Sequence, residues 1–170
     1  MVDELTRYEI CKEIIRMADE NGLTIGTAES CTGGLVCGAL TDVPGSSGAV
    51  RGSIVSYAIP IKEEVLGVPK QITEDPKTGV ISPECAHAMC EGARNVLGCD
   101  IVVSITGIAG PGGEEPGKPV GTVWFGVASP SGTKTYHKHF HGNRDDVRTQ
   151  AVNFALRRLY RSLKKEIQQG

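Results

Sequence analysis

Hydroxyl side chains that could act as nucleophiles gather first at one turn of this sequence. Ser30 and Thr32 lie there and are followed at once by Gly33 and Gly34. Adjacent glycines let a backbone approach a ligand closely, and a helix that begins after them would point unpaired N–H groups toward it. We therefore predict an anion or oxyanion site at this turn. A hydroxyl helix cap, with glycines needed only for packing, is the structural alternative.

A second cluster brings serine, tyrosine and lysine into one short supersecondary unit. Ser46 and Ser47 follow Pro44-Gly45, and Tyr57 ends a strand-like run five residues before Lys62. Nucleophilic acyl transfer needs a nucleophile, a base that takes its proton, and donors for the tetrahedral oxyanion. Lys62 is the base nearest in sequence, and its pKa must fall from about 10.4 to roughly 7–8 for this role. Turn serines and a solvated helix lysine are the structural alternative.

Two arginines offer a place for a phosphate group. Arg144 and Arg148 lie four residues apart on one face of a predicted helix. Their guanidinium groups, together with the start of that helix, could hold a phosphate group through paired hydrogen bonds. A solvated pair that bridges to Asp145 or Asp146 is the alternative.

Three histidines alternate along a predicted strand and raise the question of a metal. His137, His139 and His141 share one face by the period of two, a spacing that could collect an ion. No acidic or sulfur side chain is interleaved with them, so we prefer an exposed polar strand face and predict no metal and no cofactor.

The six cysteines include no C-x-x-C pair, and we expect reduced thiols. Cys31 alone, at a helix start, could compete as a nucleophile.

The elements that must position these groups follow from hydrophobic periodicity. Helices are expected over about 3–20, 33–40, 61–66, from residue 83 after a serine cap, and over about 144–165, and strands over 23–28, 52–57, 100–106, 120–129 and 133–140. Helices that alternate with strands, together with one antiparallel hairpin, predict an α/β fold. Specifically, we expect a three-layer α/β/α domain with a mixed, mostly parallel sheet of about five strands.

Two segments are predicted to be loops near the site. Residues 71–79 are polar and could fold over it. Residues 107–117 are rich in glycine and proline and follow a strand that is apolar throughout, which suits a binding loop. Thr106, Gly107 and Gly110 are the substrate-binding candidates at this strand end.

Length and charge limit the classes of partner. With 170 residues the chain is predicted to form a single domain over 1–170 with one core. Its 18 Lys and Arg against 20 Asp and Glu give a net charge of −2, so we expect no nucleic-acid partner, although a local cationic pocket is compatible with this balance. The acidic start and the lack of a bilayer-length apolar run predict a cytoplasmic protein without a membrane partner.

Several motifs in a fixed order resemble the CinA carboxy-terminal domain family. They are Ala28–Gly34, Gly45–Ser47, Arg51–Gly52, Tyr57 with Lys62, Ser104–Pro111 and Lys118–Trp124. The resemblance extends from about residue 5 to residue 159. The family includes the nicotinamide-nucleotide amidohydrolases, so it implies conversion of nicotinamide mononucleotide to nicotinate mononucleotide and ammonia, in pyridine nucleotide salvage. The predicted partner is this small mononucleotide. We also expect a homo-oligomer, most simply a dimer, which the sequence itself does not fix.

The resemblance also implies roles for individual side chains. Ser47 matches the active serine, Tyr57 the tyrosine and Lys62 the lysine, while Ser30 and Thr32 match the hydroxyls beside the substrate amide. In that mechanism Ser47 attacks the carboxamide carbon, and neutral Lys62 accepts its proton directly or through Tyr57. Attack by Ser30, by the neighbouring thiol or directly by water stays open as an alternative.

One segment departs from the family pattern. The residues Ala58–Ile61 are more apolar than the Ser-Asn-x-x sequence usual there. This difference motivates a rival from another class, a nucleotide-binding module that keeps the pocket without turnover. A zinc-dependent hydrolase built on the histidines is a third and weaker hypothesis.

Overall fold

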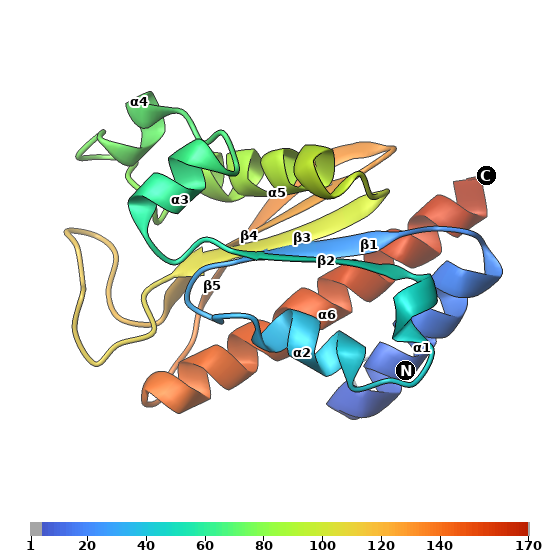
Figure 1. The fold of residues 1–170 in the computed structure, drawn as a ribbon. Helices are drawn as coiled ribbons and strands as arrows, with labels where there is room; N and C mark the ends of the chain where they lie inside the picture. The colour runs from blue at the N-terminus through green and yellow to red at the C-terminus, as the bar shows by residue number, and fades with distance from the viewer. Residues whose placement is uncertain (1–4, 170) are drawn as a thin grey trace.

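The computed structural model describes residues 5–169, in which helices cover both faces of a central sheet (Figure 1). Its elements are α1 (Arg7–Glu20), β1 (Ile25–Glu29), α2 (Leu35–Thr41), the 3-10 turn η2 (Ser46–Gly48), β2 (Val50–Val55), α3 (Ile59–Glu64), α4 (Lys70–Thr73), α5 (Pro83–Leu97), β3 (Ile101–Gly107), β4 (Thr122–Ser129), β5 (Gly132–His139) and α6 (Arg144–Gln169). The predicted three-layer α/β/α architecture with a five-stranded mixed sheet is confirmed.

The sheet has the strand order β2-β1-β3-β4-β5. β1 pairs in parallel with both β2 and β3, whereas β4 is antiparallel to β3 and to β5. Four strands therefore share one direction and β4 alone opposes them. The carboxyl ends of β1, β2 and β3 meet at one edge, and the chain that leaves β5 enters α6 at this same edge. We call it the catalytic edge, because it gathers Ser30, Tyr57 and Lys62, which the sequence analysis predicted to be catalytic, together with Arg144.

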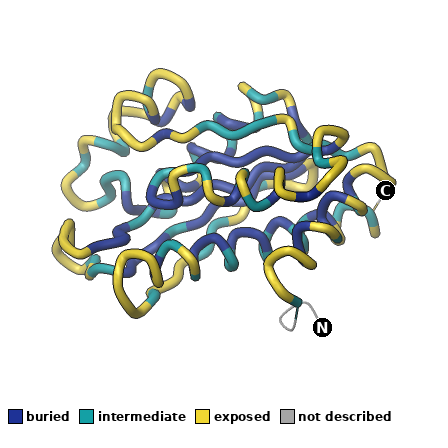
Figure 2. The backbone as a smooth tube through the Cα atoms, turned by 60° about the horizontal axis from the view of Figure 1, so that its bottom comes forward, coloured by how far each residue is buried: buried dark blue, intermediate teal, exposed yellow. Residues whose placement is uncertain are grey.

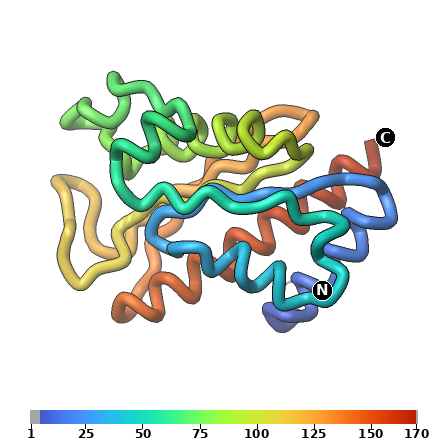
Figure 3. The backbone as a smooth tube through the Cα atoms, viewed as in Figure 1, coloured from blue at the N-terminus to red at the C-terminus, as the bar shows by residue number. Residues whose placement is uncertain are grey.

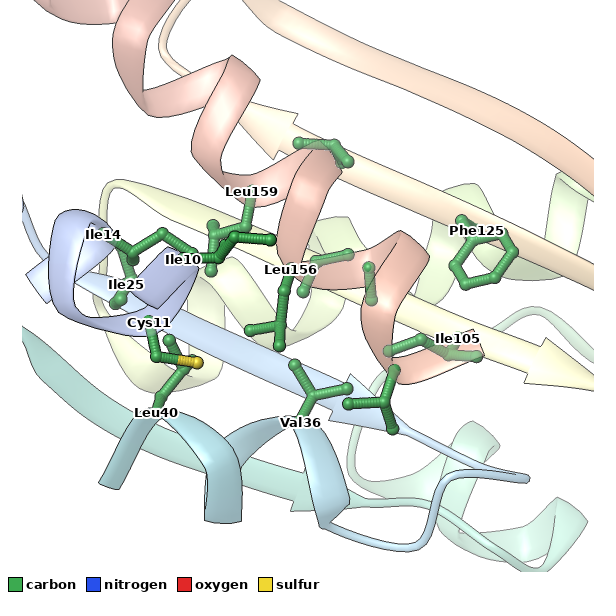
Figure 4. Close-up of a cluster of buried hydrophobic side chains, with 14 of the residues drawn as sticks. Ile10, Cys11, Ile14, Ile25, Val36, Leu40, Ile105, Phe125, Leu156 and Leu159 are labelled. Atoms are coloured by element: carbon green, nitrogen blue, oxygen red, sulfur yellow. The ribbon is translucent and has the colours of Figure 1, made fainter. Parts of the chain in front are cut away.

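Two apolar clusters attach the helices to the sheet. The larger lies between the sheet and α1, α2 and α6, and Figure 4 shows side chains of all three helices converging on the strands. The smaller lies under α5 on the other face. Burial concentrates along the strands and the inner helix faces, while the loops at both ends are exposed (Figure 2). The sheet is thus packed on both faces, and this packing fixes the positions of the residues at the strand ends.

Local sequence signals set most element boundaries. α1 begins after Thr6, whose side chain accepts a hydrogen bond from the Glu9 N–H while the Glu9 carboxylate accepts one from the Thr6 N–H. This capping box explains the start of the helix, and the predicted start near residue 3 lies outside the described residues. α5 begins as predicted at Pro83, with Ser82 as its cap.

Some boundaries differ from the prediction. β2 begins at Val50 rather than at residue 52, and α6 continues to Gln169 rather than ending near 165. The short helix α4 occupies the start of the segment predicted as a loop.

None of the helices within 5–169 is long and apolar enough to cross a membrane.

Candidate active site

A buried lysine and a partly buried serine meet at the catalytic edge. Lys62 is 2% exposed, and its amine Nζ lies 3.1 Å from the Ser30 hydroxyl Oγ. The same amine donates to the Ser56 carbonyl and, at 3.4 Å, to the Tyr57 carbonyl. Ser30 comes directly after β1, Ser56 directly after β2, and Lys62 from α3. The parallel pairing of β1 and β2 therefore brings these groups together.

The burial of Lys62 follows from the short helix that carries it. Ile59 and Ile61 on the same helix are exposed, so Lys62 takes the inward position, where its amine contacts the strand ends and interacts with Cys85 of α5. Burial lowers the pKa of Lys62, while the nearby Cys85 and Cys31 thiols act in the opposite direction. A lowered pKa increases the fraction of neutral amine near pH 7, which is the form that accepts a proton.

The Cys31 thiol beside this pair is protonated near neutral pH, so it does not compete with Ser30 as the nucleophile. Burial raises the pKa of Cys31 to about 12, and the side chain is 5% exposed. Because the thiolate rather than the thiol is the nucleophile, Cys31 is inert near neutral pH. The structure favours the serine hydroxyl over this alternative.

Glu29, which the sequence analysis did not single out, caps the amino-terminal end of α2. Its buried carboxylate accepts hydrogen bonds from the N–H groups of Gly34, Val36 and Cys37 at 3.0, 3.1 and 2.9 Å. The Gly33 N–H donates instead to the Ser30 carbonyl. The expectation that the start of this helix offers unpaired N–H groups to a ligand is wrong, because the donors of Gly34, Val36 and Cys37 already have a partner in Glu29.

The two glycines have a clear conformational role instead. Gly33 and Gly34 have φ values of 62° and 98°, in the left-handed region that other residues rarely adopt. They turn the chain from β1 into α2 so that Glu29 reaches the helix start. A signal for Glu29 existed in the sequence, since a carboxylate just before a helix start is favoured by the helix dipole.

Two buried hydroxyls beside the turn lack hydrogen-bond partners. Within residues 5–169, Thr32 Oγ1 and Ser56 Oγ are buried without a partner. The N–H groups of Cys31 and Thr32 likewise have no backbone carbonyl as acceptor in this part of the chain. Buried polar groups are nearly always paired, so these two unpaired hydroxyls are exceptions that a function at this turn would explain. Ser56 was missed by the sequence analysis because nothing in its spacing sets it apart.

Ser47 lies far from this place. It belongs to η2, which precedes β2, whereas Lys62 follows β2. Six strand residues at about 3.3 Å each separate the two ends of β2 by roughly 20 Å. Figure 3 shows the turn before β2 beside α1, at the opposite edge of the sheet from α3. The predicted proton transfer from Ser47 to Lys62 is therefore not possible within one chain, because the strand holds them apart.

The remaining predicted side chains do reach the catalytic edge. Arg144 donates to the Gly110 carbonyl at 2.8 Å and to the Tyr57 hydroxyl at 3.2 Å. Arg148 donates to the carbonyls of Cys31 and Thr32 at 3.1 and 3.3 Å. Within 5–169 neither arginine forms an ion pair with the aspartates of its own helix. The first turns of α6 are thus attached to the catalytic turn and to Tyr57.

The end of β3 has a mostly structural role. The Thr106 hydroxyl is buried and donates to the Val80 carbonyl at 2.7 Å. A side chain at Gly107 would lie 2.8 Å from the Thr122 carbonyl, so glycine is needed there for strand packing. Gly110 differs, since its carbonyl contacts Arg144 and its loop lies beside the first turn of α6 (Figure 3).

The histidines form contacts with the protein itself. The His137 ring lies 4.7 Å from the Trp124 ring, and His139 Nε2 lies 2.9 Å from the Val120 carbonyl. Among the described residues, no group of three or more His, Cys, Asp or Glu side chains is arranged to hold a metal ion.

Comparison with known proteins identifies the family. The model of the CinA C-terminal domain matches residues 7–163. A CinA-like protein from Geobacter metallireducens is 44% identical over 150 residues, which are 88% of this chain and 36% of that protein. A CinA-like protein from Sulfurihydrogenibium sp. is 45% identical over 161 residues, covering 93% of this chain and 39% of that protein. The chain therefore spans a little over a third of the length of these curated relatives.

Solved structures agree with the sequence matches. A CinA superfamily protein from Klebsiella pneumoniae 700603 superposes with a TM-score of 0.89 at 31% identity, covering 95% of this chain and 99% of that one. The competence/damage inducible protein CihA from Agrobacterium tumefaciens gives a TM-score of 0.85 at 35% identity, covering 93% of this chain and 95% of that one. The chain belongs to the CinA C-terminal domain family, and the predicted resemblance is confirmed.

Proposed function

We propose that this protein hydrolyses the carboxamide of nicotinamide mononucleotide to give nicotinate mononucleotide and ammonia. The observation that carries the proposal is the buried Lys62 amine 3.1 Å from the Ser30 hydroxyl. A neutral amine beside a serine hydroxyl is a nucleophile and base pair for acyl transfer. Ser30 replaces Ser47 as the nucleophile in this proposal, because the Ser30 hydroxyl lies within hydrogen-bond distance of Lys62 and Ser47 does not.

The contacts of Lys62 support its role as a base. A neutral amine has two N–H donors and one lone pair. The carbonyls of Ser56 and Tyr57 accept from two positions of the amine, which leaves the third position directed at Ser30 Oγ. When Lys62 is neutral, its lone pair therefore faces the serine proton. Its burial favours this neutral state.

The proposed reaction has two stages. Ser30 Oγ forms a bond to the carboxamide carbon as its proton passes to Lys62, and the tetrahedral oxyanion forms. Lys62 then returns the proton to the amide nitrogen, the C–N bond breaks and ammonia leaves. Water, deprotonated by Lys62, attacks the resulting ester and restores the serine hydroxyl. The N–H groups of Cys31 and Thr32, with Thr32 Oγ1, are the proposed donors to the oxyanion, since these groups lack backbone partners.

Tyr57 and Arg144 are proposed to bind the rest of the substrate. The Tyr57 side chain is 61% exposed, while its hydroxyl is held by Arg144. Its ring face suits the cationic pyridinium of the mononucleotide, because a cation over an aromatic ring is attracted by the ring quadrupole. Arg144 donates two hydrogen bonds, to the Gly110 carbonyl and the Tyr57 hydroxyl. Because a guanidinium carries five N–H groups, it has further donors for a phosphate.

The direct test is product formation by protein treated with EDTA. Incubation with nicotinamide mononucleotide is expected to release one ammonia for each nicotinate mononucleotide formed, measured by chromatography and a coupled ammonia assay. Binding without product over hours would favour the rival, a nucleotide-binding module. Loss of activity to the chelator and in His139→Ala would instead favour the zinc hydrolase.

The two arginines are expected to affect different kinetic constants. Arg144→Ala should raise KM more than it lowers kcat, because the phosphate is distant from the reacting carbon. Arg148→Ala should mainly lower kcat, because Arg148 holds the carbonyls of the turn that carries Ser30. Steady-state kinetics on both variants separates these effects.

The substrate offers a matched control for the same site. Nicotinamide riboside, which lacks the phosphate, should be a poor substrate of the wild type. Arg144→Ala should lower the rate of riboside hydrolysis only slightly further. Hydrolysis of the riboside as fast as the mononucleotide would contradict a dedicated phosphate position.

A further inference from the structure

A cavity lined by cationic and hydroxyl side chains lies at the end of the strands opposite the catalytic edge. It encloses about 190 Å³ between the β4–β5 hairpin and the carboxyl-terminal half of α6. Because β4 is antiparallel to β3, the β4–β5 turn lies at the other edge of the sheet from Ser30, and Figure 1 shows it near the end of α6. This cavity is therefore separate from the proposed active site.

The wall of the cavity is strongly cationic. Lys134 from β5 and Arg158, Arg161 and Lys165 from α6 line it, together with the hydroxyls of Ser129, Ser131 and Ser162. Of the described residues that line it, none is acidic. The whole chain carries a net charge of −2, so four cationic groups around one small cavity are a local concentration that the overall composition does not suggest.

Arg158 is fixed in place within this wall. Its guanidinium carbon lies 4.1 Å from the centre of the Tyr136 ring and 4.8 Å from that of the Phe154 ring. Its Nε is buried, and within residues 5–169 it has no hydrogen-bond partner. An arginine ordered by aromatic stacking loses little entropy on binding, and its unpaired donor lacks an acceptor that a ligand could supply.

One acid, Glu166, lies beside the cavity and binds two of the serine hydroxyls that line it. Glu166 accepts hydrogen bonds from Ser129 at 2.8 Å and from Ser131. Burial alone would raise the pKa of Glu166, but these serine hydrogen bonds hold its pKa below the usual value. The carboxylate is thus ionised and bound to the hairpin, where it orders Ser131, the acceptor for Lys165 Nζ at 3.3 Å.

We propose that this cavity is a binding site for a phosphate group, separate from the substrate site. Three features support this class of ligand: lysine and arginine cations from both β5 and α6, the Ser162 hydroxyl beside them, and the absence of carboxylates from the described lining. Phosphate accepts several hydrogen bonds at once and pairs with the planar guanidinium fork. The volume suits inorganic phosphate or the phosphate end of a small phosphomonoester.

Titration calorimetry with inorganic phosphate tests the proposal, with sodium chloride at matched ionic strength as the blank. Wild type is expected to bind one phosphate in this cavity. Lys134→Met and Lys165→Met should each weaken binding by about tenfold or more, as loss of a charge-assisted hydrogen bond implies. Ribose 5-phosphate in a parallel titration distinguishes a phosphomonoester from free phosphate as the preferred source.

Lys164→Met is the matched control, because Lys164 is the neighbouring exposed lysine on α6 and does not line the cavity. It should weaken binding by less than about twofold, since a distant exposed charge is screened by salt. Lys134 and Lys165 are also exposed, so their variants are expected to fold, which circular dichroism checks.

Arg144→Ala separates this cavity from the catalytic edge. Phosphate binding that survives Arg144→Ala and falls in Lys165→Met supports the proposal. Binding that is lost in Arg144→Ala and kept in Lys165→Met would place the phosphate at the catalytic edge and overturn it. Absence of binding to the wild type, or equal losses in Lys164→Met and Lys165→Met, would overturn it as well.

Discussion

Ser30→Ala is expected to abolish turnover of nicotinamide mononucleotide while leaving substrate binding largely intact. The substitution removes the hydroxyl that lies 3.1 Å from Lys62 Nζ, and among the described residues the Ser30 side chain forms no other hydrogen bond. The Ser30 backbone N–H still donates to the Ile105 carbonyl, so the turn keeps its place. Loss of a nucleophile from a cooperating pair costs about 10³-fold or more in kcat. Single-turnover kinetics and calorimetry on the variant measure the two effects separately.

Ser47→Ala is the matched control for this prediction. Ser47 is exposed and lies at the other end of β2, so the variant should retain near-native kcat and KM. Near-native activity of Ser30→Ala with correctly folded protein would exclude the Ser30 mechanism. If Ser47→Ala lost turnover while Ser30→Ala kept it, the active serine predicted by resemblance would regain the role, and its distance from Lys62 would then need a different explanation.

Sequence patterns predicted the fold well because they report local physics. The capped start of α5 at Pro83, the apolar strand near 101–106 and the β4–β5 hairpin each depend on neighbouring residues. The ends of β2 and α6 were less accurate. β2 extends back to Val50, which pairs with Ile25 on β1, and such pairing is not visible in the segment itself.

The site was predicted in part, and the error at Ser47 has a physical cause. Ser47, Tyr57 and Lys62 are close in sequence, but a strand of extended chain lies between the first and the other two. Ser30 is more distant in sequence from Lys62, yet parallel pairing of β1 with β2 places both beside the same strand ends. Proximity along the chain is therefore a poor guide to contact where a strand intervenes.

Long-range arrangements account for what else the sequence did not predict. Arg148 reaches the carbonyls of the catalytic turn across more than a hundred residues, so its contacts could not be assigned from spacing. The cationic cavity likewise combines a hairpin with a helix that follows it. The sequence analysis allowed for a local cationic pocket but had no means to place it. The predicted homo-oligomer stays a prediction.

Activity is expected to rise with pH through the lowered pKa of Lys62 and to level off above it. Lysine accepts a proton only when neutral, so kcat/KM follows the neutral fraction of the free protein. Burial lowers the pKa of Lys62 from its ordinary value, which moves the rise toward neutral pH. In Lys62→Met the rise should disappear, and kcat/KM should fall by about 10³-fold or more, because Ser30 then lacks a base. A pH profile of kcat/KM for both proteins measures this.

Lys62→Arg distinguishes a base from a merely structural cation. Arginine keeps the positive charge and can donate to the carbonyls of Ser56 and Tyr57, but it does not lose its proton in proteins. The variant should therefore be as inactive as Lys62→Met across the whole pH range. Partial activity of Lys62→Arg with no pH-dependent rise would mean that the charge at this position orients the site, and that another group takes the proton from Ser30. Thermal unfolding of both variants shows whether the burial of the new side chain, rather than the loss of the base, causes the effect.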